Sequence, residues 1–410
     1  MNRLFSFSFL FFSFVLLVLS ACNKSPVPNQ GGASSGVDGQ QGVAVGEGNA
    51  PASGAAVATP IAPSALEMPY YKRMEGLVEG EGLVWHITGS NNVLQGSYVQ
   101  TNSKHFGELM SSTSETVGQF ALLEYDYTLK DYPVQTASIK GRFGDAATFT
   151  AIRMPKEGAT VALSLQEKYP AGTTALRLVE RKRNADKAAA EKARLSINLL
   201  YPQIRAGLAP AAAQAIDQAI ERRMSGFLLP TNRSGATVPG IEEAMEMLQK
   251  SYDKDGKPYQ MTWFYEVSSS VFANENHVLN LLLSAQTYSG GARPEQTVAS
   301  LAFDLKTGKP LYLADFFQTG FEHRLRKVIE QILRKKNGLS DEEAITQVGF
   351  VKNEVPLPQH FTLNKHSLTV WYNPYELRAG STPTSIIIPI ADIADIIAKE
   401  AFWAAGAGTN

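Results

Sequence analysis

Short apolar runs separated by turn residues fill the chain from Pro69 to Arg181. Several of them alternate apolar and polar residues, as Leu94–Gln100 does, which is the two-residue period of a half-buried strand. Regular short strands with polar turns predict an antiparallel β-domain over residues 66–182, closed as a barrel or folded as a sandwich. The runs are Tyr70–Val78, Leu83–Thr88, Val93–Val99, His105–Met110, Gln119–Tyr125, Gln135–Phe143, Ala147–Met154, Val161–Gln166 and Ala175–Val179.

A charged, alanine-rich stretch follows, residues 183–194. It has no Gly or Pro and predicts a helical spacer, after which the pattern of apolar residues changes. Residues 195–401 segregate strands and helices into blocks, which predicts an α+β domain with a mostly antiparallel sheet. The expected strands are Leu195–Tyr201, Gln260–Phe272, His277–Tyr288, Thr297–Asp304, Phe361–Leu363, Ser367–Tyr372 and Ser385–Pro389. The expected helices are Pro210–Met224, Ile241–Ser251, Glu322–Lys336, Asp341–Gln347 and Ile390–Ala401, followed by a flexible tail, residues 402–410.

The first 22 residues have the layout of a secretory signal. A positive charge at Arg3 precedes an apolar run, Leu4–Leu19, and small residues follow it. Leu19-Ser20-Ala21-Cys22 resembles the lipobox of bacterial lipoproteins, a family in which the cysteine receives diacylglycerol and becomes the new N-terminus. An ordinary signal peptide with an incidental cysteine is the alternative. Cys22 is the only cysteine, so no intramolecular disulfide can form and an apolar core must stabilise the fold.

The lipobox resemblance implies that lipid on Cys22, including palmitate, anchors the protein to a membrane. It also implies a location in the cell envelope. Asn23, instead of the Asp that retains lipoproteins at the inner membrane, implies the outer membrane if the organism is Gram-negative. Residues 23–65 are rich in Gly, Ala, Ser and Pro and predict a disordered tether.

Two stretches of the C-terminal half carry a family resemblance. Thr287–Pro294 with Phe303–Phe317, and Trp371–Glu376 with Ile386–Pro389, are similar to the RsiV-like extracytoplasmic domain, which also precedes the catalytic domain of PdaC-type peptidoglycan deacetylases. The resemblance covers about half of the chain. It implies an extracytoplasmic sensor or binding module of the kind found in a lysozyme-sensing anti-sigma factor.

The sequence departs from this family in ways that narrow the expectation. Arg293 stands where the family usually has His, which removes a metal or acid/base role at that position. We find no transmembrane and sigma-binding segments before the domain and no deacetylase after it, so we expect the binding module alone.

Motifs for catalysis or cofactor binding are absent from the sequence. The histidines show no metal-ligand spacing and no glycine-rich loop cradles phosphate, so we expect no metal and no cofactor. The formal net charge of −1 gives no indication of a nucleic-acid partner. A pair of carboxylates for sugar hydrolysis stays open, because such pairs need not be close in sequence.

Six residues are candidates for partner binding. Tyr288, Gly290, Gly291 and Arg293 form one run, in which the glycines either make a tight structural connection or present the flanking side chains to a partner. Tyr372 and Tyr375 lie in an aromatic run that belongs either to the core or to an interface, since Tyr, Trp and Arg are the usual interface anchors.

These observations predict a non-enzymatic, lipid-anchored envelope protein that binds a protein or peptidoglycan partner, in its sharpest form a lysozyme-type muramidase or the glycan that it cuts. The near-neutral charge counts against a strongly basic partner. One alternative is a cell-wall-modifying hydrolase with dispersed carboxylates. Another is binding of a small ligand or host protein through the β-domain.

Overall fold

The computed structural model describes residues 68–90, 93–116, 119–128, 133–185, 194–229, 238–398 and 402–403. All of these belong to one compact unit, Ala58–Asn410. The predicted signal peptide, Cys22 and the tether therefore lie outside the described residues, as does most of the predicted tail. Among the described residues, no helix is both long and apolar enough to cross a membrane.

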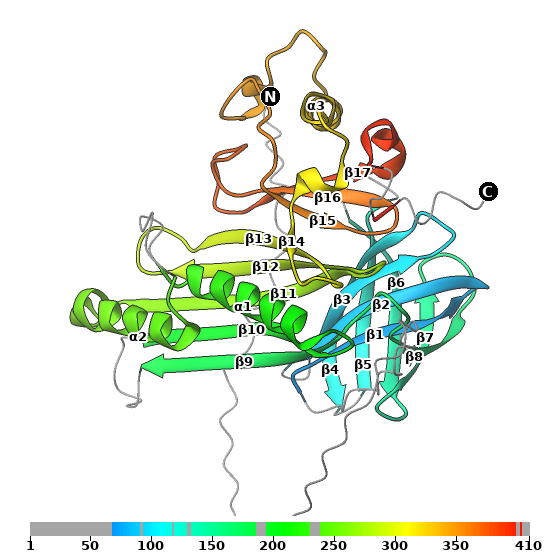
Figure 1. Ribbon diagram of the computed structural model, residues 1–410, viewed down its shortest axis with the longest axis horizontal. Coiled ribbons are helices and arrows are strands. Elements are labelled where there is room, and N and C mark those ends of the chain that lie inside the picture. Colours follow the sequence, from blue (N-terminus) through cyan, green and yellow to red (C-terminus); the bar gives the residue numbers. More distant parts are fainter. Residues whose placement is uncertain are drawn as a thin grey trace, which may run out of the picture. The chain divides into compact units, whose positions relative to one another are not determined.

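The first part of the unit is a closed antiparallel barrel of eight strands in sequence order (Figure 1). Each strand pairs with the next, and β1 closes the barrel against β8 with Met74 opposite Glu167. The strands are β1 Tyr70–Val78, β2 Glu81–Ser90, β3 Val93–Gln100, β4 Phe106–Thr116, β5 Gln119–Asp126, β6 Val134–Phe143, β7 Thr148–Pro155 and β8 Val161–Glu167. The antiparallel β-domain expected from the sequence is confirmed, and its form is a barrel.

Side chains fill the inside of this barrel. Alternate residues of every strand point inward, and they include Trp85, Leu109, Ile139 and Phe149, each at most 1 % exposed. The Trp85 and Phe149 rings lie 5.7 Å apart between centroids. The centre of the barrel is thus an aromatic and aliphatic core.

The second part is built on a six-stranded sheet in the order β14-β13-β12-β11-β10-β9. Its strands are β9 Ala175–Ala185, β10 Arg194–Ala206, β11 Thr262–Glu275, β12 Val278–Tyr288, β13 Glu295–Asp304 and β14 Pro310–Leu311. β10 and β11 are parallel, and the other neighbours are antiparallel. The expectation of a mostly antiparallel sheet in an α+β region is confirmed.

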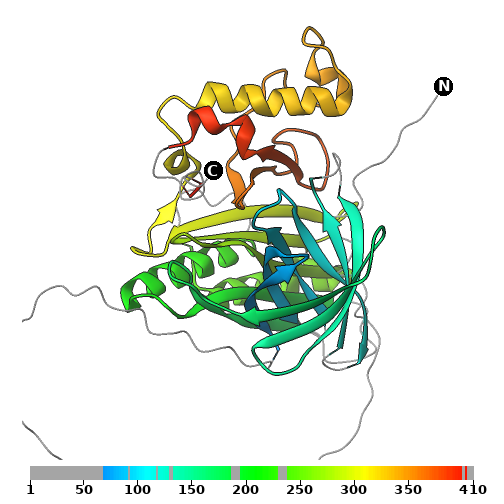
Figure 2. The ribbon, with the colours of Figure 1, turned by 90° about the vertical axis from the view of Figure 1, so that its right-hand side faces the viewer.

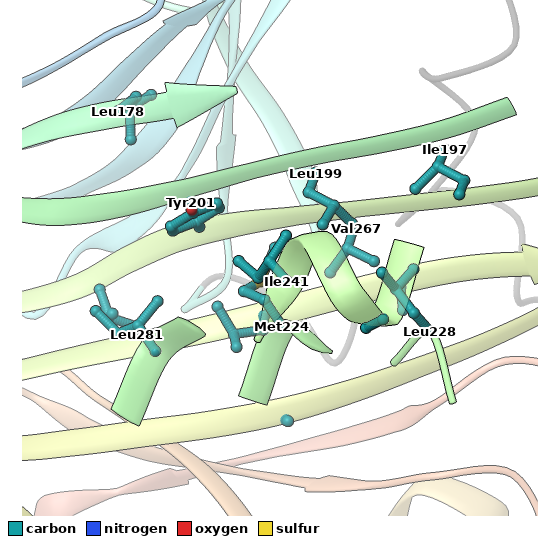
Figure 3. Packing of buried hydrophobic residues seen from close by; sticks show 14 of the residues in the cluster. Leu178, Ile197, Leu199, Tyr201, Met224, Leu228, Ile241, Val267 and Leu281 are labelled. Atoms are coloured by element: carbon teal, nitrogen blue, oxygen red, sulfur yellow. The ribbon is translucent and has the colours of Figure 1, made fainter. Parts of the chain in front are cut away.

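Two helices cover one face of this sheet, α1 Pro210–Gly226 and α2 Ile241–Ser251 (Figures 1 and 2). The buried face of α1 recurs every fourth residue, at Ala212, Ile216, Ile220 and Met224, as the helical period requires. Figure 3 shows Met224 and Ile241 of these helices against odd-numbered sheet residues such as Leu199, Val267 and Leu281.

A smaller layer lies on the opposite side of β12 and β13. It contains the three-stranded sheet β15 His360–Leu363, β16 Ser367–Tyr372 and β17 Thr384–Pro389, covered by α3 Glu322–Asn337 (Figure 2). Asn280 of β12 joins the two sheets, because its Oδ1 accepts from the Leu363 N–H at 2.8 Å. The remaining helical elements are short: a π-helical turn at Tyr252–Gly256 and 3₁₀ turns at Lys257–Tyr259, Leu313–Phe316, Ile345–Val348, Ile390–Asp392 and Ala394–Ile396.

Buried polar contacts join the barrel to the six-stranded sheet. The Tyr71 hydroxyl is hydrogen-bonded to Nδ1 of His86 at 2.8 Å and accepts from Nδ2 of Asn274 at 3.3 Å. Asn274 also exchanges two side-chain hydrogen bonds with the Thr174 backbone, and Nε of Arg73 donates to the Asn274 carbonyl at 3.2 Å. Burial lowers the pKa of His86 to about 3, so the ring is neutral where it bonds the Tyr71 hydroxyl.

Pairing with distant strands accounts for two differences from the sequence expectations. The run Ala175–Val179 is a strand, but it belongs to β9 and pairs with β10 instead of the barrel. Residues 183–185, the described part of the expected helical spacer, extend the same strand, because the ladder with β10 outweighs the helix propensity of Arg183 and Ala185. β10 continues past Pro202, which has no backbone N–H. Pairing with β11 ends at Leu199, so the proline removes no hydrogen bond to β11.

Two expected helices near the C-terminus are wrong. Asp341–Gln347 contains only a 3₁₀ turn that starts at Ile345, since the carbonyl of Glu343 accepts from Arg334 at 2.6 Å instead of from a helical N–H. Of the expected helix Ile390–Ala401, the structure describes residues 390–398, which contain two 3₁₀ turns. There the Ile396 carbonyl and the Ala398 N–H bond the backbone of residues 316–318. These backbone groups pair with residues 316–318 and are therefore not free to form the hydrogen bonds of a helix.

Candidate functional site

The β12–β13 loop holds four of the predicted site residues. Gly290 and Gly291 have φ of +95° and +120°, and a Cβ on Gly290 would lie 1.9 Å from Cε of Met261. The loop is closed by the Tyr288 hydroxyl, which donates to the Gly291 carbonyl at 2.9 Å. The glycines therefore have the structural role of a tight connection, while Arg293 stands exposed beyond them.

The two tyrosines predicted near the end of β16 have opposite environments. Tyr372 is 1 % exposed, its hydroxyl donates to the Pro356 carbonyl at 2.8 Å, and burial raises its pKa well above the ordinary value. It is a core residue, so its assignment as a contact residue is wrong, because no partner can reach its ring. Tyr375 is 61 % exposed in the loop that follows, with a φ of +69°.

Hydrogen bonds hold the β12–β13 loop and the β16–β17 loop at the same end of the two sheets. The Asn373 side chain accepts from the Val298 N–H at 2.7 Å and donates to the Val298 carbonyl at 3.0 Å. The Gln296 N–H donates to the Ser381 carbonyl at 2.9 Å. We call the part of this junction formed by Tyr288, Gly290, Gly291, Arg293 and Tyr375 the two-loop surface. Gly291, Arg293 and Tyr375 are exposed, and Tyr288 and Gly290 are half-buried.

Sequence reasoning missed several members of this region. Phe264 of β11 stacks on Tyr288 with 5.8 Å between ring centroids. Val351, 49 % exposed, lies beside the second loop because its N–H donates to the Leu377 carbonyl at 3.0 Å. Neither residue has a local sequence signal, because each reaches the site through pairing of segments that are distant in sequence.

The barrel interior contains charged side chains near both ends. Lys72 and Glu167 form an ion pair of 2.6 Å, with both side chains 0 % exposed. Toward the opposite end, Arg153 donates two hydrogen bonds to Glu124, at 2.9 and 2.7 Å, and Thr136 donates a third at 2.7 Å. These charges satisfy one another, so both sets act as internal ties of the barrel.

A metal site is not evident in the part of the chain that the structure describes. No group of three or more His, Cys, Asp or Glu residues there is placed to hold an ion. His360 and His366, which flank the β15–β16 hairpin, both have pKa values lowered chiefly by burial. His366 instead contacts the barrel, since its Nε2 lies 2.8 Å from the Gln100 carbonyl oxygen.

Comparison with known proteins gives a family for part of the chain. Residues 314–391 match a family model described as "Protein of unknown function (DUF3298)". No curated protein matches the chain.

Two solved structures are similar to a little over half of the chain, at low sequence identity. A DUF3298-family protein from Bacteroides fragilis is 20 % identical over 55 % of this chain and 95 % of its own, with a TM-score of 0.43. One from Pseudomonas aeruginosa PAO1 is 17 % identical over the same shares, also with a TM-score of 0.43. The residues that match the family model, 314–391, include α3, the three-stranded sheet and the Tyr375 loop.

Proposed function

We propose that this protein is a non-catalytic binding protein of the bacterial cell envelope, anchored by lipid on Cys22, whose two-loop surface binds a lysozyme-type muramidase or peptidoglycan. The observation that carries the proposal is the junction of the two loops. It places the exposed Tyr375 and Arg293 at one end of two sheets that are joined by hydrogen bonds.

The chemistry of the two-loop surface favours binding of a macromolecule. Tyrosine and arginine provide large contact areas with polar ends, and they are enriched where interfaces concentrate their binding energy. Tyr375 is held in a left-handed backbone conformation by its N–H bond to the Arg378 carbonyl at 2.8 Å. The backbone that carries the ring is therefore fixed before a partner arrives, which reduces the entropy lost on binding.

Calorimetric titration of the lipid-free chain, from residue 23 onward, tests this proposal. The titrants are a c-type lysozyme and soluble peptidoglycan fragments. We expect saturable binding of one of them, weakened by Tyr375→Ala by about tenfold or more, as for an interface anchor. Tyr312→Ala is the matched control, because Tyr312 is 67 % exposed and lies next to β14, at the other end of β13.

Two results would contradict the proposal. Absence of binding with both titrants would remove the assigned partners. Equal losses in Tyr375→Ala and Tyr312→Ala would show that the two-loop surface is not the binding surface.

A further inference from the structure

The six-stranded sheet has two edges that differ in length and sequence. One edge is β14, Pro310–Leu311, which is short and begins with a proline that has no N–H to donate to a further strand. The other edge is β9, Ala175–Ala185, which contains no proline and extends away from the barrel (Figure 1). Long open edges can pair with another chain, and proteins usually shorten, cover or charge them. β14 is thus too short to accept a further strand, whereas β9 is long enough.

The outer side of β9 carries backbone groups that the sheet does not use. Alternate N–H and C=O groups of an edge strand point away from its only neighbour. Among the described strands, β10 is the only one that pairs with β9, in a register that is unbroken from Leu176 to Ala185. The backbone hydrogen bonds that the described residues form outside the ladders do not involve residues 176–185. The outward groups of β9 therefore have no backbone partner in the described part of the chain.

Basic side chains dominate this edge. β9 has a formal charge of +3, because all but one of its charged residues are basic; they are Arg177, Glu180, Arg181, Lys182 and Arg183. Lys182 pairs with Glu180 at 2.7 Å. The carboxylate of Glu242 in α2 serves both Arg181 and Arg183, at 3.7 and 3.5 Å, and it is 69 % exposed, so both contacts are weak. The carboxylates that pair with β9 thus leave the edge positive.

Three of the arginines lie on one face of the sheet. Arg177, Arg181 and Arg183 are separated by even numbers of residues, so their side chains point to the same side. A strand added beside β9 places its own alternate side chains next to this row, where opposite charges stabilise the pairing and like charges destabilise it. A second copy of β9 would bring a second set of basic side chains to the row. The charge of the edge therefore favours an acidic strand and disfavours pairing of the chain with itself.

We propose that β9 is a docking edge that binds an extended acidic segment of a partner protein by strand addition. The outward backbone groups of β9 form a ladder with the segment, which supplies affinity, and the three arginines select carboxylates at alternate positions of the segment. The inference goes beyond the proposed function, because β9 contains no residue of the two-loop surface.

The test is calorimetric titration of the lipid-free chain, from residue 23 onward, with a nonapeptide of alternating glutamate and valine. The same peptide with lysine in place of glutamate is the control ligand. We expect saturable binding of the acidic peptide alone, weakened about tenfold or more by the double substitution Arg177→Glu and Arg181→Glu, because attraction across the strands becomes repulsion. Arg142→Glu, at an exposed arginine of β6 in the barrel, is the matched control and should bind like the unmodified chain. Circular dichroism and thermal unfolding must show that each variant is folded.

Amide hydrogen exchange separates strand addition from a loose electrostatic contact. In strand addition the outward N–H groups of residues 176–185 become hydrogen-bonded, so their exchange should slow when the acidic peptide is saturating. Binding without this protection would overturn strand addition.

Three further results would overturn the inference. They are absence of binding by the acidic peptide, equal binding of the basic peptide, and equal effects of the β9 substitutions and Arg142→Glu. Lysozyme or peptidoglycan binding that depends on Tyr375 is measured separately, so failure at β9 leaves the proposed function standing.

Discussion

The ion pair inside the barrel gives a stability prediction that can be worked from the structure. Lys72 Nζ donates to Glu167 Oε2 and to the Ala146 carbonyl, each at 2.6 Å, and Tyr169 donates to the other oxygen of Glu167 at 2.9 Å. Both charged side chains are fully buried. The perturbation is a double-mutant cycle of Lys72→Met, Glu167→Gln and their combination.

The single substitutions should be costly and the combination much less so. Removing one partner leaves an uncompensated charge in the interior, which costs about 3–5 kcal/mol. Lys72 also lies 5.7 Å from the centroid of the Tyr70 ring, a cation–π contact that offsets part of the loss in Glu167→Gln, so this variant should fall near the lower end. The double variant buries no charge, so its cost should be below the sum of the two single costs by about 3 kcal/mol or more.

Urea unfolding of the lipid-free chain, followed by tryptophan fluorescence, measures these costs. Trp85 in the barrel core reports on the barrel itself. The reasoning would be refuted if each single substitution cost less than about 1 kcal/mol, which is typical of an exposed pair. Additive costs in the double variant would equally refute it, because they would mean that the two charges do not interact.

Two further predictions concern a loop and the pH dependence of stability. Gly290→Ala should lower stability by about 1–3 kcal/mol and more than Gly291→Ala, since only the first also meets Met261; equal losses in thermal unfolding would mean that the contact is irrelevant. Burial lowers the pKa of His86 to about 3 from 6.5. The contribution of the neutral ring to the free energy of unfolding is therefore complete above pH 6.5 and is lost as the pH falls toward 3. The loss should be about 2 kcal/mol by pH 5. His86→Gln should remove this loss of stability at low pH. Burial raises the pKa of Glu108 to about 7, so ionisation of this residue should destabilise the fold as the pH rises from 4.5 to 7. Unchanged profiles of stability against pH in His86→Gln and Glu108→Gln would contradict both assignments.

Elements with strong local periodicity could be predicted from the sequence. β1 and α2 have the bounds Tyr70–Val78 and Ile241–Ser251 that the sequence indicated, because turn residues or glycines mark their ends. The helix expected at Ile390–Ala401 failed because its backbone bonds residues 316–318, a partner that no local pattern reveals. Local chemistry fixes an element only where no distant segment competes for its hydrogen bonds.

The candidate site was predictable in part for the same reason. The glycine pair and Tyr375 have local signals, a left-handed backbone need and an exposed aromatic residue. For Tyr372 the aromatic run left core and interface open, and it lies in the core because all residues of β16 are buried, which no local pattern reveals. The stacking of Phe264 on Tyr288 exists only through the register of β11 and β12, so it could not be found before that register was known.

The most direct test of the proposed function is one calorimetric comparison. Lysozyme and soluble peptidoglycan fragments are titrated into the lipid-free chain, its Tyr375→Ala variant and its Tyr312→Ala variant. The proposal predicts saturable binding of one titrant that is weakened by the change at Tyr375 and unaffected by the change at Tyr312. No binding of either titrant, or binding that ignores the change at Tyr375, would contradict it.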